Sequence, residues 1–370
     1  MPTDAALPDE TPSFVPDDAF VAAVRHRVRR HRRRTRQRLG AGVTLVAVIA
    51  GSGLWYTNDR LSSVQRIDLG TDPTDPDPVA DGTPFNVLLN GTDGCETSSN
   101  APLGVCADRV ANEHLADSIS VVRVDPVEKT LDLLSVPRDL WLPDRSTKIN
   151  SLTVPQLVVE LEARFGIRID HYVSVTMSGF RDLADDLTLR LSLGTAVRDR
   201  STGLDLGPGC QQIDGTQLLA LVRARHLEFR EGDAWRSDPT GDIGRVVRQQ
   251  QVWRALFDQL RDVDLGNAPT LDRALSSIAV DDSLSNADVV RLARLAQASA
   301  LRSVAALPTQ VGGDASMAWV SRRDAATVNL VIAPFGGHVE DTTDATTSTV
   351  SPEMSSILDG MESWTEISAC

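Results

Sequence analysis

The sequence predicts an α/β domain that follows one transmembrane helix. Short apolar segments with strand-like patterns alternate with longer segments whose apolar residues recur at helical spacing. An uncharged run of 18 residues stands near the N-terminus, directly after a cluster of arginines. With 370 residues and 41% hydrophobic content, the chain can bury a substantial core in one large domain or two smaller ones.

The N-terminal region is typical of a membrane anchor. Arginines crowd residues 25–38, and residues 39–56 carry no charge. As a helix the uncharged run is about 27 Å long, enough to cross the hydrocarbon core. Trp55 and Tyr56 close the run, where aromatic side chains anchor at a membrane interface. Because positive charge stays inside, residues 1–38 are expected in the cytoplasm and the domain outside the cell membrane.

Other interpretations of this segment remain open. A cleaved signal peptide has a similar layout, with a candidate cleavage point near Ile49-Ala50-Gly51, although the arginine-rich part is long for that class. The arginine run also resembles a twin-arginine signal. The cationic flank disfavours a buried core helix. An anchor and a signal both export the rest of the chain.

Charge is unevenly distributed along the chain. Residues 1–38 hold nine Arg against five Asp and Glu, a balance of +4, so the remainder carries −18 of the total −14. So acidic a body disfavours nucleic acid as a partner, and we expect none. Lys129 and Lys148 are the only lysines, so nearly all positive charge is guanidinium. Arginines within apolar segments must meet fixed anions, because Arg is almost never fully buried unless paired.

Cysteine usage agrees with export. Cys95 and Cys106 enclose a short loop containing Gly and Ser, which a disulfide could close in an oxidising compartment. Cys210 and Cys370 either pair with each other or remain free thiols, because spacing does not determine connectivity.

Composition also sets the expected boundaries of the exported domain. Residues 57–84 contain three Asp-Pro pairs and predict an extended acidic linker. Folded structure is expected to begin at Phe85 and to occupy residues 85–335. The Thr, Ser and Asp content of residues 336–370 predicts a flexible C-terminal tail.

Three apolar segments predict the first strands. They are residues 85–89, which end at a turn over 90–94, then 118–124 and 130–136. If the turn between the last two centres near residue 127 or 128, antiparallel pairing places Asp117 beside Arg138. Pro137 fits a strand end, because proline lacks the N–H that a ladder needs.

Helical periodicity and capping residues predict the later elements. These are a helix at 156–165 ending at Gly166, a strand at 171–176, a short helix from Asp214 that delivers Arg223 and Arg225, a longer helix from Asp242, and a helix at 286–300 capped by Ser285 and Asp288. If their segment is extended, Arg223 and Arg225 share a face. On the longer helix, Arg245 and Gln249 stand at i and i+4, on a stripe that continues through Val252 and Leu256. We expect this helix to point its polar end at an anion and to bury the rest.

Carboxylates and arginines at strand ends and helix starts point to one chemistry. Asp93 and Asp117 are candidate oxygen ligands for a divalent cation. The arginines that could surround it are Arg138, Arg223, Arg225 and Arg245. Phosphoryl transfer needs such a set, because its work is positioning and charge neutralisation. A pyrophosphate suits it, since the guanidinium fork binds phosphate bidentately.

Two alternatives bear on this hypothesis. The arginines could serve only in local ion pairs, such as Asp117 with Arg138, Asp139 with a neighbour, and Asp242 with Arg245. Other chemistries find less support: the six histidines lack metal spacing, no Gly-x-Ser-x-Gly elbow occurs, and no Gly-rich phosphate loop ends in Lys.

Several motifs then follow one another in a recognisable order. They are GTD at 91–93, DSISVVRVDP at 117–126, LLSVPRD at 133–139, KIN at 148–150, GIRIDHYV at 166–173, IDGTQLLALVRAR at 213–225 and GDIGRVVRQQ at 241–250. This order resembles the LytR-CpsA-Psr family of membrane-anchored cell-wall phosphotransferases. The resemblance covers residues 85 to 260 and continues more weakly to residue 335.

The resemblance implies a mixed central β-sheet flanked by helices, with an apolar groove for a polyprenyl tail. It implies transfer of a phosphorylated glycopolymer from a polyprenyl-pyrophosphate carrier to a muramic-acid hydroxyl of peptidoglycan, with magnesium or manganese as cofactor. Matched by motif, the residues take these roles: Asp93 and Asp117 hold the metal, Arg138, Arg223, Arg225 and Arg245 grip the pyrophosphate, and Asp242 and Gln249 support them.

The chain departs from the family at two places. Leu115 stands where the family usually has an arginine, two residues before the second aspartate, and His114 or Arg109 could substitute. A glycine pair common in the family is missing around residues 188–191. Two rival functions therefore stay open, a polyprenyl-pyrophosphate hydrolase and a non-catalytic lipid- or wall-binding regulatory protein.

Overall fold

The computed structural model describes residues 64–70, 79, 82–92, 116–187, 189–260, 275, 277–311, 318–319, 325–340 and 366–370. The chain divides into two units, residues 1–39 and 40–370, and every described residue belongs to the second. The predicted cytoplasmic tail, the predicted transmembrane helix, Asp93, the Cys95–Cys106 loop and Leu115 all lie outside these residues. Within the described ranges, none of the helices combines the length and the apolar character that crossing a membrane requires.

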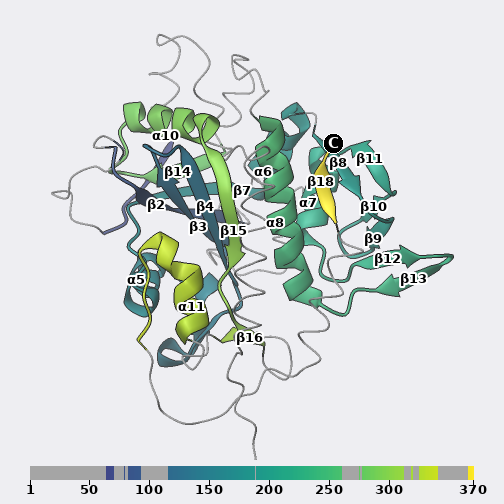
Figure 1. Ribbon diagram of the computed structural model, residues 1–370, viewed down its shortest axis with the longest axis horizontal. Coiled ribbons are helices and arrows are strands. Elements are labelled where there is room, and N and C mark those ends of the chain that lie inside the picture. The colour runs from purple at the N-terminus through teal and green to yellow at the C-terminus, as the bar shows by residue number, and fades with distance from the viewer. Residues whose placement is uncertain are drawn as a thin grey trace, which may run out of the picture. The chain divides into compact units, whose positions relative to one another are not determined.

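A mixed seven-stranded sheet forms the centre of the domain (Figure 1). In spatial order its strands are β1 (Gln65–Ile67), β14 (Ile278–Asp281), β7 (His171–Thr176), β2 (Phe85–Thr92), β3 (Ala116–Asp125), β4 (Thr130–Val136) and β15 (Ala300–Ala306). The pairs β1–β14, β7–β2 and β4–β15 are parallel, and the other neighbours are antiparallel. The α/β class and the mixed central sheet are therefore confirmed.

Helices cover both faces of this sheet. They are α5 (Val154–Phe165), α6 (Met177–Leu187), α7 (Gly215–Arg223), α8 (Gly241–Leu260), α10 (Asn286–Ala298) and α11 (Ala325–Ile332), with short 3-10 turns at Pro143–Arg145, Ile149–Ser151 and Ala333–Phe335. The predicted caps are present: Gly166 ends α5 in the left-handed conformation, and Asp214 and Ser285 begin α7 and α10 with capping boxes. The longer predicted helix begins at Gly241, one residue before Asp242.

Two hydrophobic cores lie on opposite faces of the sheet because strand residues alternate in direction. On β2, Val87 and Leu89 belong to the core under α7, α8 and α10, whereas Leu88 belongs to the core under α5 and α11. Figure 1 shows α8 between the large sheet and a group of small strands, with α5 and α11 in another part of the domain. The candidate site belongs to the α8 side.

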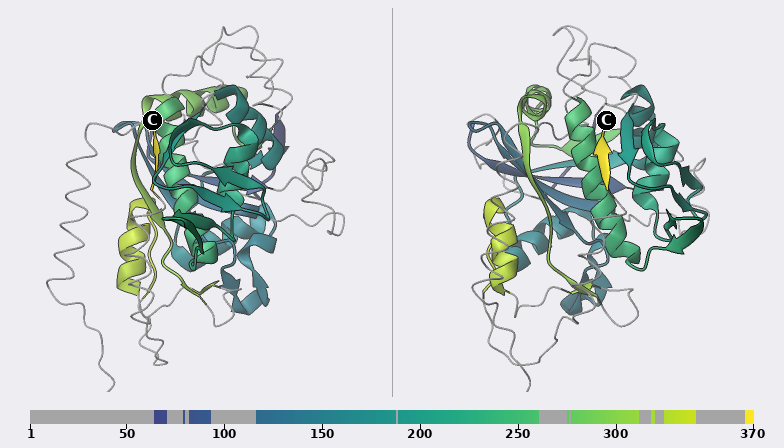
Figure 2. Two further views of the ribbon diagram at one scale, coloured as in Figure 1. Left: turned by 90° about the vertical axis from the view of Figure 1, so that its right-hand side faces the viewer. Right: turned by 45° about the vertical axis from the view of Figure 1, so that its right-hand side comes forward.

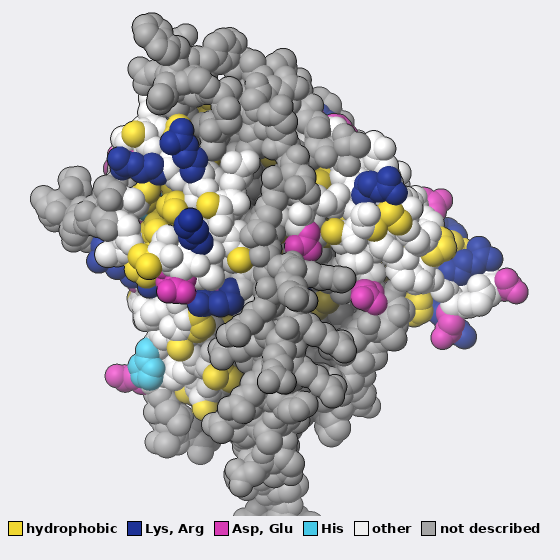
Figure 3. All heavy atoms as spheres, turned by 45° about the horizontal axis from the view of Figure 1, so that its top comes forward, with side chains coloured by type: hydrophobic (Ala, Val, Ile, Leu, Met, Phe, Trp, Pro, Cys, Tyr) yellow, Lys and Arg dark blue, Asp and Glu magenta, His cyan; other side chains and the backbone are white. Residues whose placement is uncertain are grey.

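The small strands form four further sheets. They are β9 (Val197–Asp199), β10 (Leu204–Leu206), β12 (Glu228–Glu231) and β13 (Ala234–Ser237) in one sheet, β8 (Arg190–Leu193), β11 (Gly209–Gln212) and β18 (Ile367–Ala369) in a second, β5 (Trp141–Leu142) with β6 (Thr147–Lys148), and β16 (Gln310–Val311) with β17 (Ala318–Trp319). The β12–β13 hairpin projects from the domain, and Figure 3 shows side chains of both charge signs near its tip. Arg230 pairs there with Asp233 and Arg236 with Glu231.

Three predicted boundaries were wrong. The segment 57–84 was expected to be a linker, yet β1 lies within it and pairs with β14, and Leu69 is buried. The segment 336–370 was expected to be a flexible tail, yet β18 pairs with β8 and lies alongside α8 (Figure 2). The first strand was expected to end at Leu89, yet β2 continues to Thr92. The first two errors involve strands of three residues whose partners are distant in sequence.

Candidate functional site

A cavity of about 360 Å³ lies among the ends of β2, β3 and β7 and the helices α6, α7 and α8. The structure brings six of the predicted site residues together on its wall, namely Asp117, Arg138, Arg223, Arg225, Arg245 and Gln249. Asp93 lies outside the described residues, and the side chain of Asp242 is likewise not described. Four arginines against one aspartate give the described lining a surplus of positive charge, although the chain as a whole is acidic.

Most of the remaining wall is apolar. It is formed by Leu89, Val175, Met177, Phe180, Leu219, Val222, Val252, Trp253 and Leu256. Phe180 and Trp253 meet edge to face, with ring centroids 6.5 Å apart. The stripe predicted on α8 is therefore present: Arg245 and Gln249 line the cavity, and so do Val252 and Leu256 further along the same helix. One cavity thus combines an anion-binding part with an apolar part.

The pairing of Asp117 with Arg138 follows from the β3–β4 hairpin. Ile119 pairs with Val136, and continuing this register by two residues puts Asp117 beside Arg138. Their side chains form an ion pair that is mostly shielded, with exposed fractions of 18% and 14%. The position of Asp117 beside Arg138, predicted from hairpin geometry, is confirmed. The local ion pair that was the alternative to anion binding is also present for these two residues.

Asp139 connects neighbouring cations. Its carboxylate accepts a hydrogen bond from the Lys148 ammonium at 2.7 Å and lies 3.7 Å from the Arg225 guanidinium. Arg223 differs, because no carboxylate in the part of the chain that the structure describes lies within ion-pair distance of it. Among Arg138, Arg223 and Arg225, only Arg223 has no ion pair with a carboxylate of the described residues.

Helix α8 holds the backbone that carries Arg223 and Arg225. The amide Nε2 of Gln249 donates to the Val222 carbonyl at 2.9 Å, and the Arg248 guanidinium donates to the Ala224 carbonyl. These two carbonyls flank Arg223, where α7 ends and the chain becomes extended. Gln249 thus contacts the backbone directly before Arg223.

Arg248 has a structural role that the sequence did not reveal. Its side chain is 1% exposed and pairs with the equally buried Asp238 at 2.8 Å. A Cβ at Gly244 would lie 2.6 Å from the Asp238 carboxylate and would also collide with Thr240. The glycine therefore lets α8 approach this ion pair closely. In the segment GRVVR, Arg245 lines the cavity, whereas Arg248 ties α8 to Asp238 and to the Ala224 carbonyl.

A second group of polar residues lines the cavity beside Arg225. Ser201 and Thr202 follow β9, and His226 follows Arg225. The fully buried Asp199 joins them: its carboxylate accepts the Ser201 hydroxyl at 2.6 Å and the backbone N–H of His226 at 2.9 Å. Burial acts to raise the pKa of this carboxyl, but these hydrogen bonds outweigh it and hold the pKa below its usual value. Sequence reasoning missed this group.

A divalent cation would have one described carboxylate to bind. Asp117 lines the cavity, and Arg138 contacts only its Oδ1 atom. No group of three or more acidic, His or Cys side chains suited to a metal occurs within the described ranges. Mg²⁺ commonly takes one or two carboxylates together with substrate phosphates, so the chemistry of Asp117 fits such an ion.

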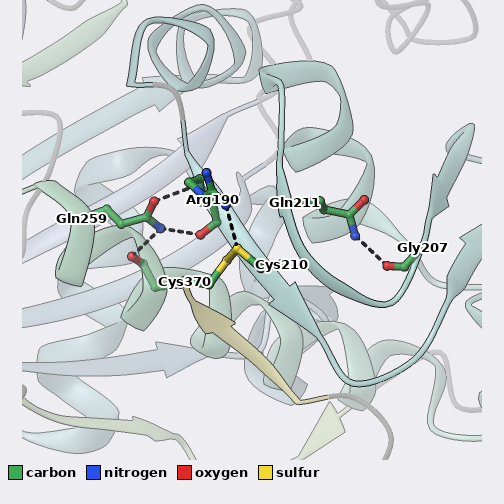
Figure 4. Close-up of a disulfide and its surroundings, with 7 residues drawn as sticks. Arg190, Gly207, Cys210, Gln211, Gln259 and Cys370 are labelled. Atoms are coloured by element: carbon green, nitrogen blue, oxygen red, sulfur yellow. Dashed lines mark hydrogen bonds between the residues drawn. A yellow bond between two sulfur atoms is a disulfide. The ribbon is translucent and has the colours of Figure 1, made fainter.

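A disulfide closes the small-strand region next to α8. Cys210 on β11 bonds to Cys370 directly after β18 (Figure 4). Arg190 donates to the Cys210 sulfur at 3.2 Å, and Gln259 near the end of α8 bonds to both the N–H and the carbonyl of Arg190. Of the two alternatives for these cysteines, the structure shows the bonded one.

The known proteins similar to this chain include two that are named for cell-wall functions. LcpB of Corynebacterium glutamicum, described as a probable cell wall biosynthesis protein, is 29% identical over 230 residues, or 59% of this chain and 50% of LcpB. The polyisoprenyl-teichoic acid–peptidoglycan teichoic acid transferase TagU of Bacillus mycoides is 25% identical over 59% of this chain and 66% of its own. The regulatory protein MsrR of Staphylococcus aureus is 35% identical over 39% of this chain and 43% of its own. The matches thus span about half to two thirds of the first two relatives.

Solved structures share the fold. A LytR-Csp2A-Psr enzyme from Actinomyces oris superposes with a TM-score of 0.54 at 23% identity, covering 74% of this chain and 96% of its own. TagV of B. subtilis gives a TM-score of 0.50 at 19% identity, covering 70% and 99%. Residues 57–316 match the LytR_cpsA_psr family. The chain belongs to the LytR-CpsA-Psr family.

Proposed function

We propose that this protein transfers a phosphorylated glycopolymer from a polyprenyl-pyrophosphate carrier to a muramic-acid hydroxyl of peptidoglycan. The observation that carries the proposal is the cavity in which four arginines adjoin an apolar wall. A polyprenyl pyrophosphate has the same two parts, an anionic diphosphate and a hydrocarbon chain. Guanidinium forks bind phosphate oxygens, and apolar side chains bind the chain.

In this proposal the arginines bind the diphosphate and neutralise the charge that develops on the leaving polyprenyl phosphate. Arg245 is 5% exposed and therefore acts with little competition from water. Gln249 and Arg248 keep Arg223 and Arg225 in place through the backbone carbonyls of Val222 and Ala224. Asp117 would hold a Mg²⁺ or Mn²⁺ ion, which supplies further charge neutralisation at the phosphate oxygens when bound.

The proposal places the domain outside the cell membrane, anchored through residues 39–56. The uncharged segment after the arginine cluster supports an anchor. The Cys210–Cys370 disulfide supports export, because disulfides persist in oxidising compartments and are rare in the cytosol.

A reconstituted transfer assay tests the proposal. The full chain would be incubated with a farnesyl pyrophosphoryl disaccharide, a soluble uncrosslinked peptidoglycan fragment and Mg²⁺, and the phosphodiester product would be quantified by mass spectrometry. We expect wild-type turnover and a loss of at least about a hundredfold in Arg138→Ala and Arg225→Ala, because each removes charge from the diphosphate site. Arg236→Ala, on the exposed β13 strand, is the matched control and should retain activity.

The same assay separates the rival functions. Disaccharide phosphate released at equal rates with and without the peptidoglycan fragment would indicate a hydrolase. Donor binding without any turnover would indicate a regulatory protein. One relative, MsrR, is named a regulatory protein. Full activity in both Arg138→Ala and Arg225→Ala would refute the assigned site.

A further inference from the structure

The transfer reaction needs a group that removes a proton. When a sugar hydroxyl attacks phosphorus, its oxygen gains positive charge unless it loses its proton. A positioned general base that takes this proton raises the rate by about a hundredfold to ten-thousandfold. The cavity's arginines cannot serve, since a guanidinium stays protonated in proteins. This inference rests on the proposed function and concerns the side of the cavity that would receive the acceptor.

Among the described cavity-lining residues, two have side chains of the kinds that act as general bases in enzymes. They are Asp117 and His226. Asp117 is engaged in an ion pair with Arg138 and is the carboxylate assigned above to a cation. His226 carries an exposed side chain, and an imidazole is the most frequent general base in enzymes.

The backbone around His226 is fixed more firmly than its exposure suggests. Its N–H donates to Oδ2 of Asp199, a carboxylate with no exposed surface. On one side lies Arg225, which lines the cavity, and on the other Leu227, which is buried in the core. The imidazole is therefore attached to an ordered segment that also presents a diphosphate-binding arginine.

Two hydroxyls next to His226 suit a sugar. Ser201 Oγ donates its proton to Asp199 Oδ1 at 2.6 Å, and Thr202 Oγ1 donates to the Asp199 carbonyl at 3.4 Å. Because both protons are used towards Asp199, the oxygens keep acceptor lone pairs for other donors. Sugar hydroxyls are such donors. Asp199 thus orders one rim of the cavity, formed by Ser201, Thr202 and His226, with hydrogen-bond acceptors and a base.

We infer that this rim is the acceptor subsite and that His226 is the general base that removes the proton of the attacking sugar hydroxyl. The acceptor oxygen forms a bond to the phosphorus that bears the glycan, and the bond from that phosphorus to the oxygen of polyprenyl phosphate breaks. The proton passes to an imidazole nitrogen of His226 and then to solvent. Polyprenyl phosphate leaves with the electron pair.

Variants of the full chain test the inference in the farnesyl pyrophosphoryl disaccharide assay. His226→Gln keeps a polar side chain of similar size but cannot accept the proton, so kcat should fall at least about a hundredfold. The KM for the donor should stay within about twofold, because the arginines are intact. His338→Gln, an exposed histidine outside the cavity lining, should behave as wild type. Added imidazole should restore turnover in His226→Gly, with the rate rising in proportion to the concentration of free imidazole.

The outcomes separate the inference from the proposed function. An inactive wild-type protein would overturn the proposed function and the inference with it. An active wild type with unchanged kcat in His226→Gln would overturn only the assignment of the base. Loss of activity in His226→Gln without imidazole rescue of His226→Gly would also overturn it, because a structural role predicts loss but no rescue.

Discussion

Removing the Cys210–Cys370 disulfide should destabilise the domain by several kcal/mol. The two cysteines are 160 residues apart, so the bond restricts a very large loop in the unfolded chain. The chain-entropy relation gives about 5 kcal/mol at 25 °C for a loop of this length. Because native disulfides commonly contribute about 2–5 kcal/mol, we expect Cys370→Ser to lose about 3 kcal/mol or more.

Urea unfolding measures this loss. With a urea dependence of about 3 kcal/mol per M, the midpoint of Cys370→Ser should fall by about 1 M relative to wild type. Cys210→Ser should show the same shift, since each change removes the same bond. When wild type and variants are all unfolded in a thiol reductant, they should share one midpoint, so that the difference disappears.

A common midpoint for the oxidised wild type and Cys370→Ser would show that the disulfide does not stabilise the domain. A shift confined to a local probe of β18, with an unchanged global midpoint, would also contradict this stabilisation, since β18 would then fray independently of the domain. Activity provides a second reading. Because β18 packs against α8, and Gln259 of α8 bonds to Arg190 beside the disulfide, loss of the bond should also loosen the helix that carries Arg245.

Two further predictions concern residues around the cavity. Gly244→Ala should lower the free energy of unfolding by about 2–4 kcal/mol in thermal or urea denaturation, because the added Cβ would press on Asp238 and Thr240. Gly194→Ala is the control and should be neutral, since a Cβ there meets open space. Equal stabilities of the two variants would contradict the close approach of α8 at Gly244. The pKa of Asp199 is lowered in the folded state, so its contribution to stability is present above about pH 4 and is lost as the pH falls through the folded-state pKa. In Asp199→Asn the free energy of unfolding should therefore fall less steeply with decreasing pH than in the control Asp205→Asn, which changes an exposed carboxyl. Parallel pH profiles of the two variants would refute this role of Asp199.

Local patterns predicted much of the fold and part of the site. The apolar segments of β2, β3, β4 and β7 and the caps of α5, α7 and α10 depend on neighbouring residues, so sequence periodicity was sufficient for them. The contact between Asp117 and Arg138 followed from hairpin arithmetic, because a short turn determines strand register.

The missed features depend on distant partners. β1 and β18 have three residues each and are defined by β14 and β8, which no local pattern indicates. Arg248 looks like Arg245 in the sequence, and only the position of Asp238 distinguishes its buried pairing. The sequence Asp199-Arg-Ser-Thr-Gly does suggest a turn, but its attachment to the backbone of His226 required the tertiary structure.

Helix α8 sets the length over which a ligand in the cavity can contact apolar side chains of this helix. Arg245 and Leu256 are eleven positions apart on one continuous helix, so their axial separation is about 16 Å. A ligand whose anionic group reaches Arg245 and whose chain follows α8 therefore meets apolar side chains of this helix over a defined length. Substitutions at Val252 or Leu256 should thus change the tolerated chain length without moving the anion site, which makes this helix a natural place to engineer carrier selectivity.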